Sequence, residues 1–120
     1  MPPPKQGEIY WVDLEPTRGR EQKGLRPALV LSRDELNRLP LTILVMIGTG
    51  AEHCTRRYPS DLWVTAAESG LPKDIVFLGV HLRAVDPGRL QKVAGRLPEQ
   101  RLTEVFDIVR LLIGDDRPLA

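Results

Sequence analysis

The sequence has little of what many catalytic and secreted proteins rely on. Among its 120 residues Cys54 is the only cysteine, and there are two histidines, His53 and His81. A single cysteine excludes an intrachain disulfide, and these residues show no metal-ligand spacing. The sequence also has no phosphate-binding glycine loop, no Gly-x-Ser-x-Gly motif and no zinc-binding pattern. We therefore expect no metal site and no cofactor.

Long apolar runs are missing as well. No run approaches the roughly 18–20 residues of a membrane-spanning helix. The first residues, MPPPKQ, have no apolar core and cannot form a signal peptide. Together with the single free cysteine, these features predict a cytoplasmic protein with no membrane partner. The net charge is only +1, so nucleic-acid binding would have to come from a local cluster of charges.

Length and composition indicate a single domain. Hydrophobic residues make up 42% of the chain and charged residues 28%, as in globular proteins. A chain of this length can bury a core without disulfides or metals. We expect one domain over residues 7–114, with a disordered, Pro-rich N-terminal tail at 1–6 and a polar C-terminal tail at 115–120.

Apolar patterns predict a mainly antiparallel β protein. Strands are expected at residues 8–14, 26–32, 41–47, 60–65, 74–86 and 89–96. Loops are expected at 15–24, 49–58 and 66–73, a single helical turn at 33–38, and a bend or bulge at Gly79. Because Pro27 has no N–H, it should begin its strand or lie beside an unpaired edge.

A helix is expected over residues 98–113. Pro98 fits the first helical position, Gly114 fits the position just past the end, and apolar residues recur at helical spacing between them. The fold class is therefore mainly β with helices (α+β). We expect a small curled antiparallel barrel with a C-terminal helix, because closing the sheet would hide its edges.

The most unusual segment is a cationic one, residues 17–38. It has six basic residues (Arg18, Arg20, Lys23, Arg26, Arg33 and Arg38) against three acids, Glu21, Asp34 and Glu35. On composition alone it is equally well read as a solvated charged face. The residues alone also allow a structural interpretation: Arg26, at the start of an apolar strand, would pair with Glu21, and Thr49 would only end a strand.

These cations and hydroxyls cannot provide a strong nucleophile, but an RNA substrate can. Its 2′-hydroxyl can attack the neighbouring phosphate. A guanidinium binds phosphate oxygens through two parallel hydrogen bonds, and a threonine hydroxyl can donate a third. Metal-free RNA cleavage is therefore one function that these residue types permit.

A more specific indication comes from the order of short motifs along residues 7 to 114. These motifs are Gly7-Glu8-Ile9-Tyr10-Trp11-Val12-Asp13-Leu14, Pro16, Gly19, Glu21-Gln22, Gly24, Arg26-Pro27-Ala28-Leu29-Val30, Asn37-Arg38, Thr42, the apolar strand ending at Thr49, Tyr58-Pro59, Gly70-Leu71, Lys73-Asp74, Arg83-Ala84-Val85-Asp86, Arg89-Leu90 and Leu111-Leu112-Ile113-Gly114. In these the chain resembles the MazF/PemK family of toxin endoribonucleases from type II toxin–antitoxin pairs.

The resemblance implies a fold, an activity and partners. The fold would be an SH3-like β-barrel, assembled as a homodimer with RNA across the dimer groove. The activity would be metal-independent, sequence-selective cutting of single-stranded mRNA, leaving a 2′,3′-cyclic phosphate and a 5′-hydroxyl. The protein partner would be an antitoxin of MazE type, whose acidic disordered tail fills the RNA groove.

The resemblance also implies roles for individual residues. The catalytic arginine of the family corresponds to Arg26 and its catalytic threonine to Thr49. Residues expected to contact RNA are Thr17, Arg18, Arg20, Glu21, Gln22, Lys23, Arg56, Arg57 and His81. The chain departs from the family at Val80-His81, where an acid–Gln pair is common, and at Met46-Ile47-Gly48, where Pro-Leu is common. We predict that His81 influences which RNA sequence is cut.

Two other functions stay open at this point. One is a protein-binding toxin of the same fold, of the gyrase-poisoning CcdB type. Such toxins rely on a tryptophan near the end of the C-terminal helix, whereas this chain ends in Asp115-Asp116-Arg117-Pro118-Leu119-Ala120. The other is a catalytically inactive relative that serves as a binding module.

Overall fold

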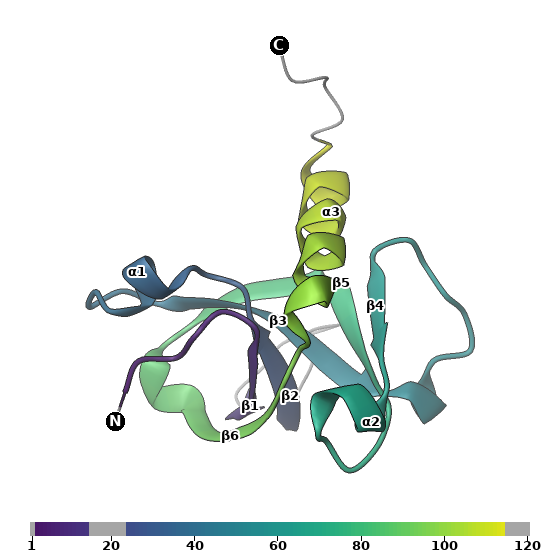
Figure 1. Ribbon diagram of the computed structural model, residues 1–120, viewed down its shortest axis with the longest axis horizontal. Coiled ribbons are helices and arrows are strands. Elements are labelled where there is room, and N and C mark those ends of the chain that lie inside the picture. The colour runs from purple at the N-terminus through teal and green to yellow at the C-terminus, as the bar shows by residue number, and fades with distance from the viewer. Residues whose placement is uncertain (1, 15–23, 115–120) are drawn as a thin grey trace.

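One six-stranded antiparallel sheet organises the molecule, and a long helix stands against one of its faces (Figure 1). The computed structural model describes residues 2–14 and 24–114. Across the sheet the strand order is β4-β5-β3-β2-β1-β6. In chain order the strands are β1 (Glu8–Asp13), β2 (Leu25–Val30), β3 (Ile43–Gly50), β4 (Asp61–Val64), β5 (Ile75–Val85) and β6 (Leu90–Arg96).

Short helical segments connect these strands. The α-helices are α1 (Asp34–Asn37), α2 (Ala66–Ser69) and α3 (Leu102–Ile113), and the 3-10 turns are η1 (Ala51–His53), η2 (Pro87–Arg89) and η3 (Glu99–Arg101). The α+β class and the C-terminal helix predicted from the sequence are confirmed. None of the described helices is long and apolar enough to cross a membrane.

The sheet is curled, but hydrogen bonds do not close it into a complete barrel. Within the described residues β4 and β6 form its two edges and do not pair with each other. The short helix α2 lies against β6: a Cβ atom built on Gly95 would lie 2.4 Å from the Ser69 carbonyl oxygen. Backbone of α2 thus packs closely on one face of β6 at Gly95, where a side chain would not fit.

Alternation along the strands divides the buried side chains into two clusters, because successive residues point to opposite faces of a sheet. The cluster on the α3 side includes Ile9, Leu29, Met46, Leu62, Phe77, Val105 and Ile108. The cluster on the other side consists of Tyr10, Val12, Leu14, Ala28, Val30, Ile43, Val45, Ile47, Val85 and Leu90. We call this second side the open face, since no residue of α3 belongs to its cluster.

The C-terminal helix follows its predicted apolar stripe, with Val105 and Ile108 buried against the sheet. Gly114 caps its end in the left-handed conformation, with φ 73°, as its position after the last apolar residue indicated. The beginning differs from the prediction. Pro98 precedes the 3-10 turn η3, and the α-helix starts only at Leu102.

Two further boundaries differ from the sequence prediction. The expected loop at 66–73 begins with α2, where the Thr65 and Glu68 side chains form a capping box. The expected loop at 49–58 starts later, because β3 continues through Gly50. Gly48 lies in the ladder opposite Phe77, and a Cβ there would be 2.8 Å from Ile75 Cγ2. Thr49 therefore belongs to a paired strand.

The chain before β1 runs along α1 and β2. Asn37 Nδ2 donates to the Pro4 carbonyl oxygen at 3.0 Å, and Gln6 Nε2 donates to the Leu31 carbonyl oxygen at 2.7 Å. The Gln6 backbone N–H also donates to Asp34 Oδ1 at 2.8 Å. These bonds hold Pro4 and Gln6 at the start of the sheet, at the α1 end of the molecule.

Candidate active site

Arg26 and Thr49 come level with each other on neighbouring strands. The β2–β3 ladder pairs Val30 with Val45 and ends at Ala28 opposite Ile47. Continuing the same count by two residues sets Arg26 opposite Thr49. Both side chains then point to the open face, since Ala28 and Ile47 belong to its cluster. Residues separated by 23 positions in the sequence thus meet at one end of the sheet.

Arg26 and Thr49 lie near strand ends, in surroundings where a ligand could bind. Pairing between β2 and β3 begins only after Pro27, in line with the missing N–H of that residue. Arg26 is half-buried, and Thr49 is 8% exposed. On its other side Arg26 pairs with Val12 of β1, a fully buried residue of the open-face cluster. Both polar groups therefore lie where the apolar cluster ends.

The same row of residues continues across the sheet beyond Thr49. Thr49 pairs with Val76 of β5, and Val76 pairs with Trp63 of β4. Directly paired side chains share a face, so Trp63 lies on the face of Thr49. The Arg57 guanidinium lies over the Trp63 ring, with its Cζ 4.2 Å from the ring centroid. One predicted RNA contact, Arg57, thus comes to this row.

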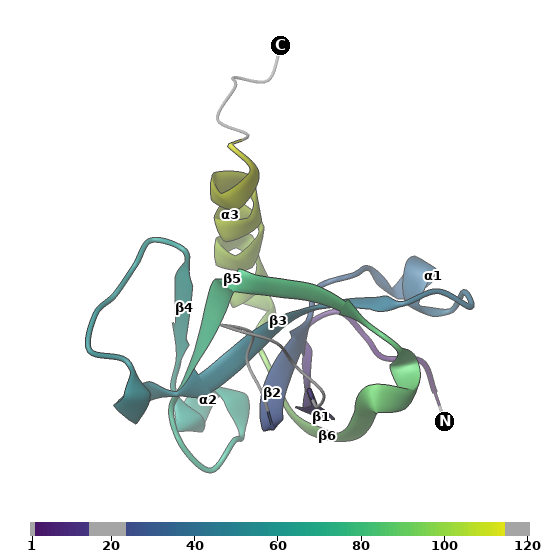
Figure 2. The same cartoon turned by 180° about the vertical axis from the view of Figure 1, so that it is seen from behind.

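His81 lies in β5 beside an irregular part of the β3–β5 ladder. The register pairs Met46 with Leu82 and then shifts, so that Gly48 pairs with Phe77. The long strand β5 bends sharply within this irregular part (Figure 2). Because Leu82 packs on the α3-side cluster, alternation turns its neighbour His81 toward the open face. His81 is half-buried, whereas its neighbour Val80 is 69% exposed.

Six of the predicted RNA contacts fall outside the described residues. They are Thr17, Arg18, Arg20, Glu21, Gln22 and Lys23. The strand ends on either side are described, and the Leu14 N–H donates to the Gly24 carbonyl oxygen at 3.0 Å. Leu14 and Gly24 therefore lie close to Arg26, which pairs with Val12 two residues further along the same ladder. Arg56 is exposed in the chain between η1 and β4.

A charged cluster that the sequence reading did not identify follows Thr49 directly. Lys73 Nζ donates to Glu52 Oε1 at 2.6 Å, and His53 Nε2 lies 3.4 Å from the same oxygen. The Lys73 ammonium holds the pKa of the exposed Glu52 carboxyl below its usual value. The carboxylate lies against Gly50, where a Cβ atom would come 2.4 Å from it. Only the β3–β5 register, which sequence spacing does not show, brings these residues together.

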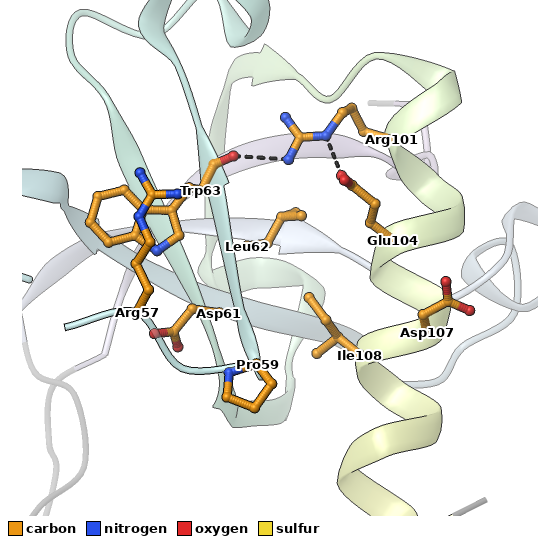
Figure 3. Close-up of a pocket in the computed structure, with 9 residues that line it drawn as sticks. All are labelled: Arg57, Pro59, Asp61, Leu62, Trp63, Arg101, Glu104, Asp107 and Ile108. Carbon is orange, nitrogen blue, oxygen red and sulfur yellow. Dashed lines mark hydrogen bonds and ion pairs between the residues drawn. The ribbon is translucent and has the colours of Figure 1, made fainter. Parts of the chain in front are cut away.

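A cleft of about 380 Å³ lies between β4 and α3, and Arg57 and Trp63 are among the residues that line it (Figure 3). Arg101 crosses its upper end, donating to the Trp63 carbonyl oxygen at 2.9 Å and to Glu68 Oε1 at 2.7 Å, and it also pairs with Glu104. The cleft is lined further by Asp61 and Asp107. Its excess of carboxylates makes it unfavourable for a phosphate.

Within residues 2–14 and 24–114, no three His, Cys, Asp or Glu side chains come together in a way that could hold a metal ion. What the open face offers instead is a guanidinium level with a hydroxyl. A guanidinium can bind two oxygens of one phosphate, while the hydroxyl donates to a third. Extra negative charge on such a phosphate would be stabilised by both groups.

Known proteins share this fold and its arrangement of strands and helix. The chain superimposes on MazF from Deinococcus radiodurans with a TM-score of 0.78, at 29% identity, covering 93% of this chain and 97% of that one. It superimposes on a MazE–MazF structure from the same organism with a TM-score of 0.71, at 25% identity, covering 93% and 96%. The endoribonuclease MazF of Staphylococcus saprophyticus is 28% identical over 110 residues, which are 92% of this chain and 91% of that protein.

The similar proteins indicate the class to which this chain belongs: small toxins built on a curled antiparallel sheet with a C-terminal helix. The family follows from the sequence model of the PemK-like, MazF-like toxins of type II toxin–antitoxin systems, which matches residues 5–113. The chain belongs to this family. The resemblance drawn from the sequence motifs is thereby confirmed, and with it the expected enzyme class, a toxin endoribonuclease.

Proposed function

We propose that this toxin cuts single-stranded mRNA in the cytoplasm, without a metal ion, at sites selected by sequence. The observation that supports the proposal is the β2–β3 ladder, which would set Arg26 level with Thr49 on the open face if it were continued by two residues beyond its last pair, Ala28 and Ile47. A phosphate between these two side chains would receive hydrogen bonds from both. The attacking group is the 2′-hydroxyl of the RNA itself, so the protein has to supply position and charge.

The proposed step balances without a further reactant. The 2′-oxygen forms a bond to phosphorus while the bond from phosphorus to the 5′-oxygen breaks, giving a 2′,3′-cyclic phosphate and a 5′-hydroxyl. Arg26 binds the phosphate, stabilises the charge of the phosphorane and donates a hydrogen bond to the leaving 5′-oxygen, which takes its proton from water. Arg26 keeps its own proton throughout, because a guanidinium scarcely loses it. The 2′-hydroxyl proton passes to water, and Thr49 donates a hydrogen bond to the phosphorane.

Sequence selection is assigned in part to His81. It is half-buried in β5 next to Leu82, which pairs with Met46, three residues before Thr49. An imidazole can stack on a base or hydrogen-bond to its edge. Glu21 and Gln22 are proposed to order the β1–β2 connection. Thr17, Arg18, Arg20, Lys23 and Arg56 are proposed to contact the RNA.

We also propose that the toxin works as a homodimer joined near α3. A groove of about 600 Å³ runs between α1, β3 and α3, and its apolar lining includes Leu36, Leu44 and Phe106. These three side chains are 46%, 40% and 39% exposed. On a monomer they would leave a substantial apolar surface in water, and an isologous contact would cover both copies at once. The proposed occupant is therefore a second copy of this chain.

The proposed protein partner is an antitoxin of MazE type with an acidic tail. Arg26, Arg56 and Arg57 belong to the part of the chain that RNA phosphates would contact, and carboxylates can bind the same guanidinium groups. An acidic peptide would thus inhibit cleavage by competing with RNA. The structure of the Deinococcus radiodurans proteins MazE and MazF together supports this proposal.

One assay tests the proposed activity. The purified protein is incubated with a long single-stranded RNA in EDTA, beside the variants Arg26→Ala and Lys92→Ala. Lys92 is an exposed cation on the edge strand β6, away from the proposed dimer groove, and serves as the control for loss of one charge. We expect discrete cuts with cyclic phosphate ends from the wild type and from Lys92→Ala only.

The other outcomes of this assay are equally informative. If no RNA is cut, a protein-binding toxin or an inactive binding module becomes the better interpretation. If Arg26→Ala cuts as fast as the wild type, Arg26 has no catalytic role. If EDTA abolishes cleavage by the wild type, the metal-independent mechanism is wrong.

A further inference from the structure

Arg57 and Trp63 form a flat cationic stack on the face that carries the candidate active site. The Arg57 Cζ lies 4.2 Å from the centroid of the indole ring, which is the geometry of a cation–π contact. In Figure 3 the ring lies on one side of β4 with Arg57 drawn across it, while Leu62 and Ile108 lie on the other side, toward α3. The Arg57 side chain is exposed, so the stack borders solvent.

The position of this stack relative to Thr49 follows from strand pairing. Thr49 pairs with Val76, and Val76 with Trp63, so two strand spacings separate Thr49 from Trp63. Two spacings amount to about 10 Å. Arg26 lies on the opposite side of Thr49, on β2. Arg26, Thr49 and the stack therefore follow one line across the strands, with Thr49 between the two guanidinium groups.

Such a line suits a single-stranded RNA. We propose that Arg57, held flat on Trp63, stacks on one nucleobase flanking the cleaved phosphate and so helps select and hold the substrate. This inference rests on the proposed ribonuclease function. A guanidinium plane and a nucleobase stack face to face, as aromatic side chains and bases do. The contact with the Trp63 ring holds the guanidinium in place, so a surface for the base exists before RNA binds.

Arg57 and Trp63 also help to line the cleft toward α3, and two observations favour the exposed face of the Arg57 guanidinium over the depth of that cleft. The cleft has the carboxylates of Asp61, Glu104 and Asp107 along its wall, and Arg101 there is engaged with Glu68 and Glu104. On the ring side, the Trp63 Nε1 atom is buried and has no hydrogen-bond partner among the described residues. An indole N–H without a partner is a donor that a base carbonyl could use if the stack opened slightly.

The inference is tested with RNA oligonucleotides that contain one cleavage site and a single abasic nucleotide at each flanking position in turn. With the wild type, we expect one abasic position to raise KM by roughly ten-fold at unchanged kcat, since a stacked base contributes about that much to binding. Arg57→Ala should raise KM by a similar factor on intact RNA. On the RNA with that abasic position, Arg57→Ala should have no further effect.

Arg56→Ala is the matched control, because it removes the same charge from the neighbouring exposed residue. Its effect on KM should be the same for intact and abasic RNA. Trp63→Phe, which keeps a ring, should retain most of the binding, whereas Trp63→Leu should behave like Arg57→Ala. In a Trp11→Phe background Trp63 is the only tryptophan, and its fluorescence should change on adding RNA whose cleavage site is 2′-deoxy.

The proposed ribonuclease function and the stacking inference would fail in different ways. If the wild type cuts no RNA, the proposed function is wrong. If the wild type cuts RNA, but Arg57→Ala loses equally from intact and abasic substrates, the arginine acts only as a charge and the stacking inference is wrong. Unchanged Trp63 fluorescence at saturating RNA would also contradict it.

Discussion

At the scale of single residues, Thr49 allows a test of the role of its hydroxyl in catalysis with a substitution that should leave the fold unchanged. It is 8% exposed in a paired strand, and valine has nearly its shape. Thr49→Val removes the hydroxyl that would donate to the phosphorane. Loss of one such donor typically lowers kcat by about 10²–10³. We expect that loss in single-turnover cleavage, with most activity retained in Thr49→Ser. A Thr49→Val enzyme of full kcat would show that Thr49 only ends the strand.

His81 concerns which sites are cut, not how fast. In β5 it precedes Leu82, which pairs with Met46, three residues before Thr49 in β3, so we expect it to contact a base and not the reacting phosphate. His81→Gln should therefore change the cleavage map more than the maximal rate on the preferred site. Sequencing the 5′-hydroxyl ends from a long RNA measures the map. The exposed neighbour Val80, changed to Thr, is the control. An unchanged map for His81→Gln would remove His81 from site selection.

The sequence indicated Arg26, Thr49, Arg57 and His81 through residue type and family resemblance. It did not indicate that Trp63 joins them, because their relation depends on the register of three strands. That register shifts between Met46 and Gly48. Gly79, where the sequence predicted a bend or bulge, lies in this irregular part, but the sequence does not show by how many residues the register shifts.

At the scale of elements, the attachment of α3 to the sheet depends on buried charge as well as apolar contacts. Arg101, next to the first residue of α3, bonds to Glu68 of α2 and to the Trp63 carbonyl oxygen of β4. Side-chain exposure is 23% for Arg101 and 24% for Glu68. One guanidinium thus links three elements, and removing either partner leaves a partly buried charge without its counterion.

This link predicts a pH-dependent stability. The Thr65 backbone N–H first, and Arg101 second, hold the pKa of Glu68 below its usual value. The stabilisation is therefore complete above the ordinary carboxyl pKa and is lost as pH falls through the lowered one. Glu68→Ala should lower the free energy of unfolding by about 1–2 kcal/mol at pH 7, through loss of the cap and the pair.

Urea unfolding at pH 7 and in the acid range, followed by circular dichroism, measures this difference. The gap between wild type and Glu68→Ala should narrow as Glu68 becomes protonated in the folded protein. Glu104→Ala is the control, because its side chain is 55% exposed and its ion pair should contribute little. A gap that stays constant down to acid pH would mean that Glu68 stabilises the fold by packing alone.

The elements themselves were largely predictable, and the errors have identifiable causes. Strong alternation and apolar runs located all six strands. The helix α2 was predicted as loop because Gly70 and Pro72 dominate that stretch, although Thr65 and Glu68 carry a capping-box signal. The end of β3 was set too early, since glycine on either side of Thr49 indicated a loop. Close packing of Gly48 on Ile75 and Phe77 instead keeps it in the sheet.

At the scale of the whole molecule, the curled sheet separates two tasks between its faces. The α3 side holds the larger mixed core, the carboxylate-lined cleft and the apolar groove beside Phe106. The open face holds Arg26, Thr49, His81 and the Arg57–Trp63 stack at the end of its own cluster. RNA binding and association between copies can therefore use different surfaces of one small domain.

The apolar groove beside Phe106 leads to a prediction about how two copies of the chain assemble. Phe106 lies on its wall and is 39% exposed, so aspartate can replace it without entering the core. If two copies meet there, Phe106→Asp introduces a charge at a desolvated contact and should convert a dimer into a monomer. Sedimentation or light scattering over a concentration series measures this. Val93→Asp is the control, since Val93 is 47% exposed on the edge strand β6 and does not line the groove. A wild type that is monomeric throughout, or a dimeric Phe106→Asp, would contradict the proposed interface.

If RNA also needs both copies to form its groove, the monomeric variant should lose affinity for RNA while Val93→Asp keeps it.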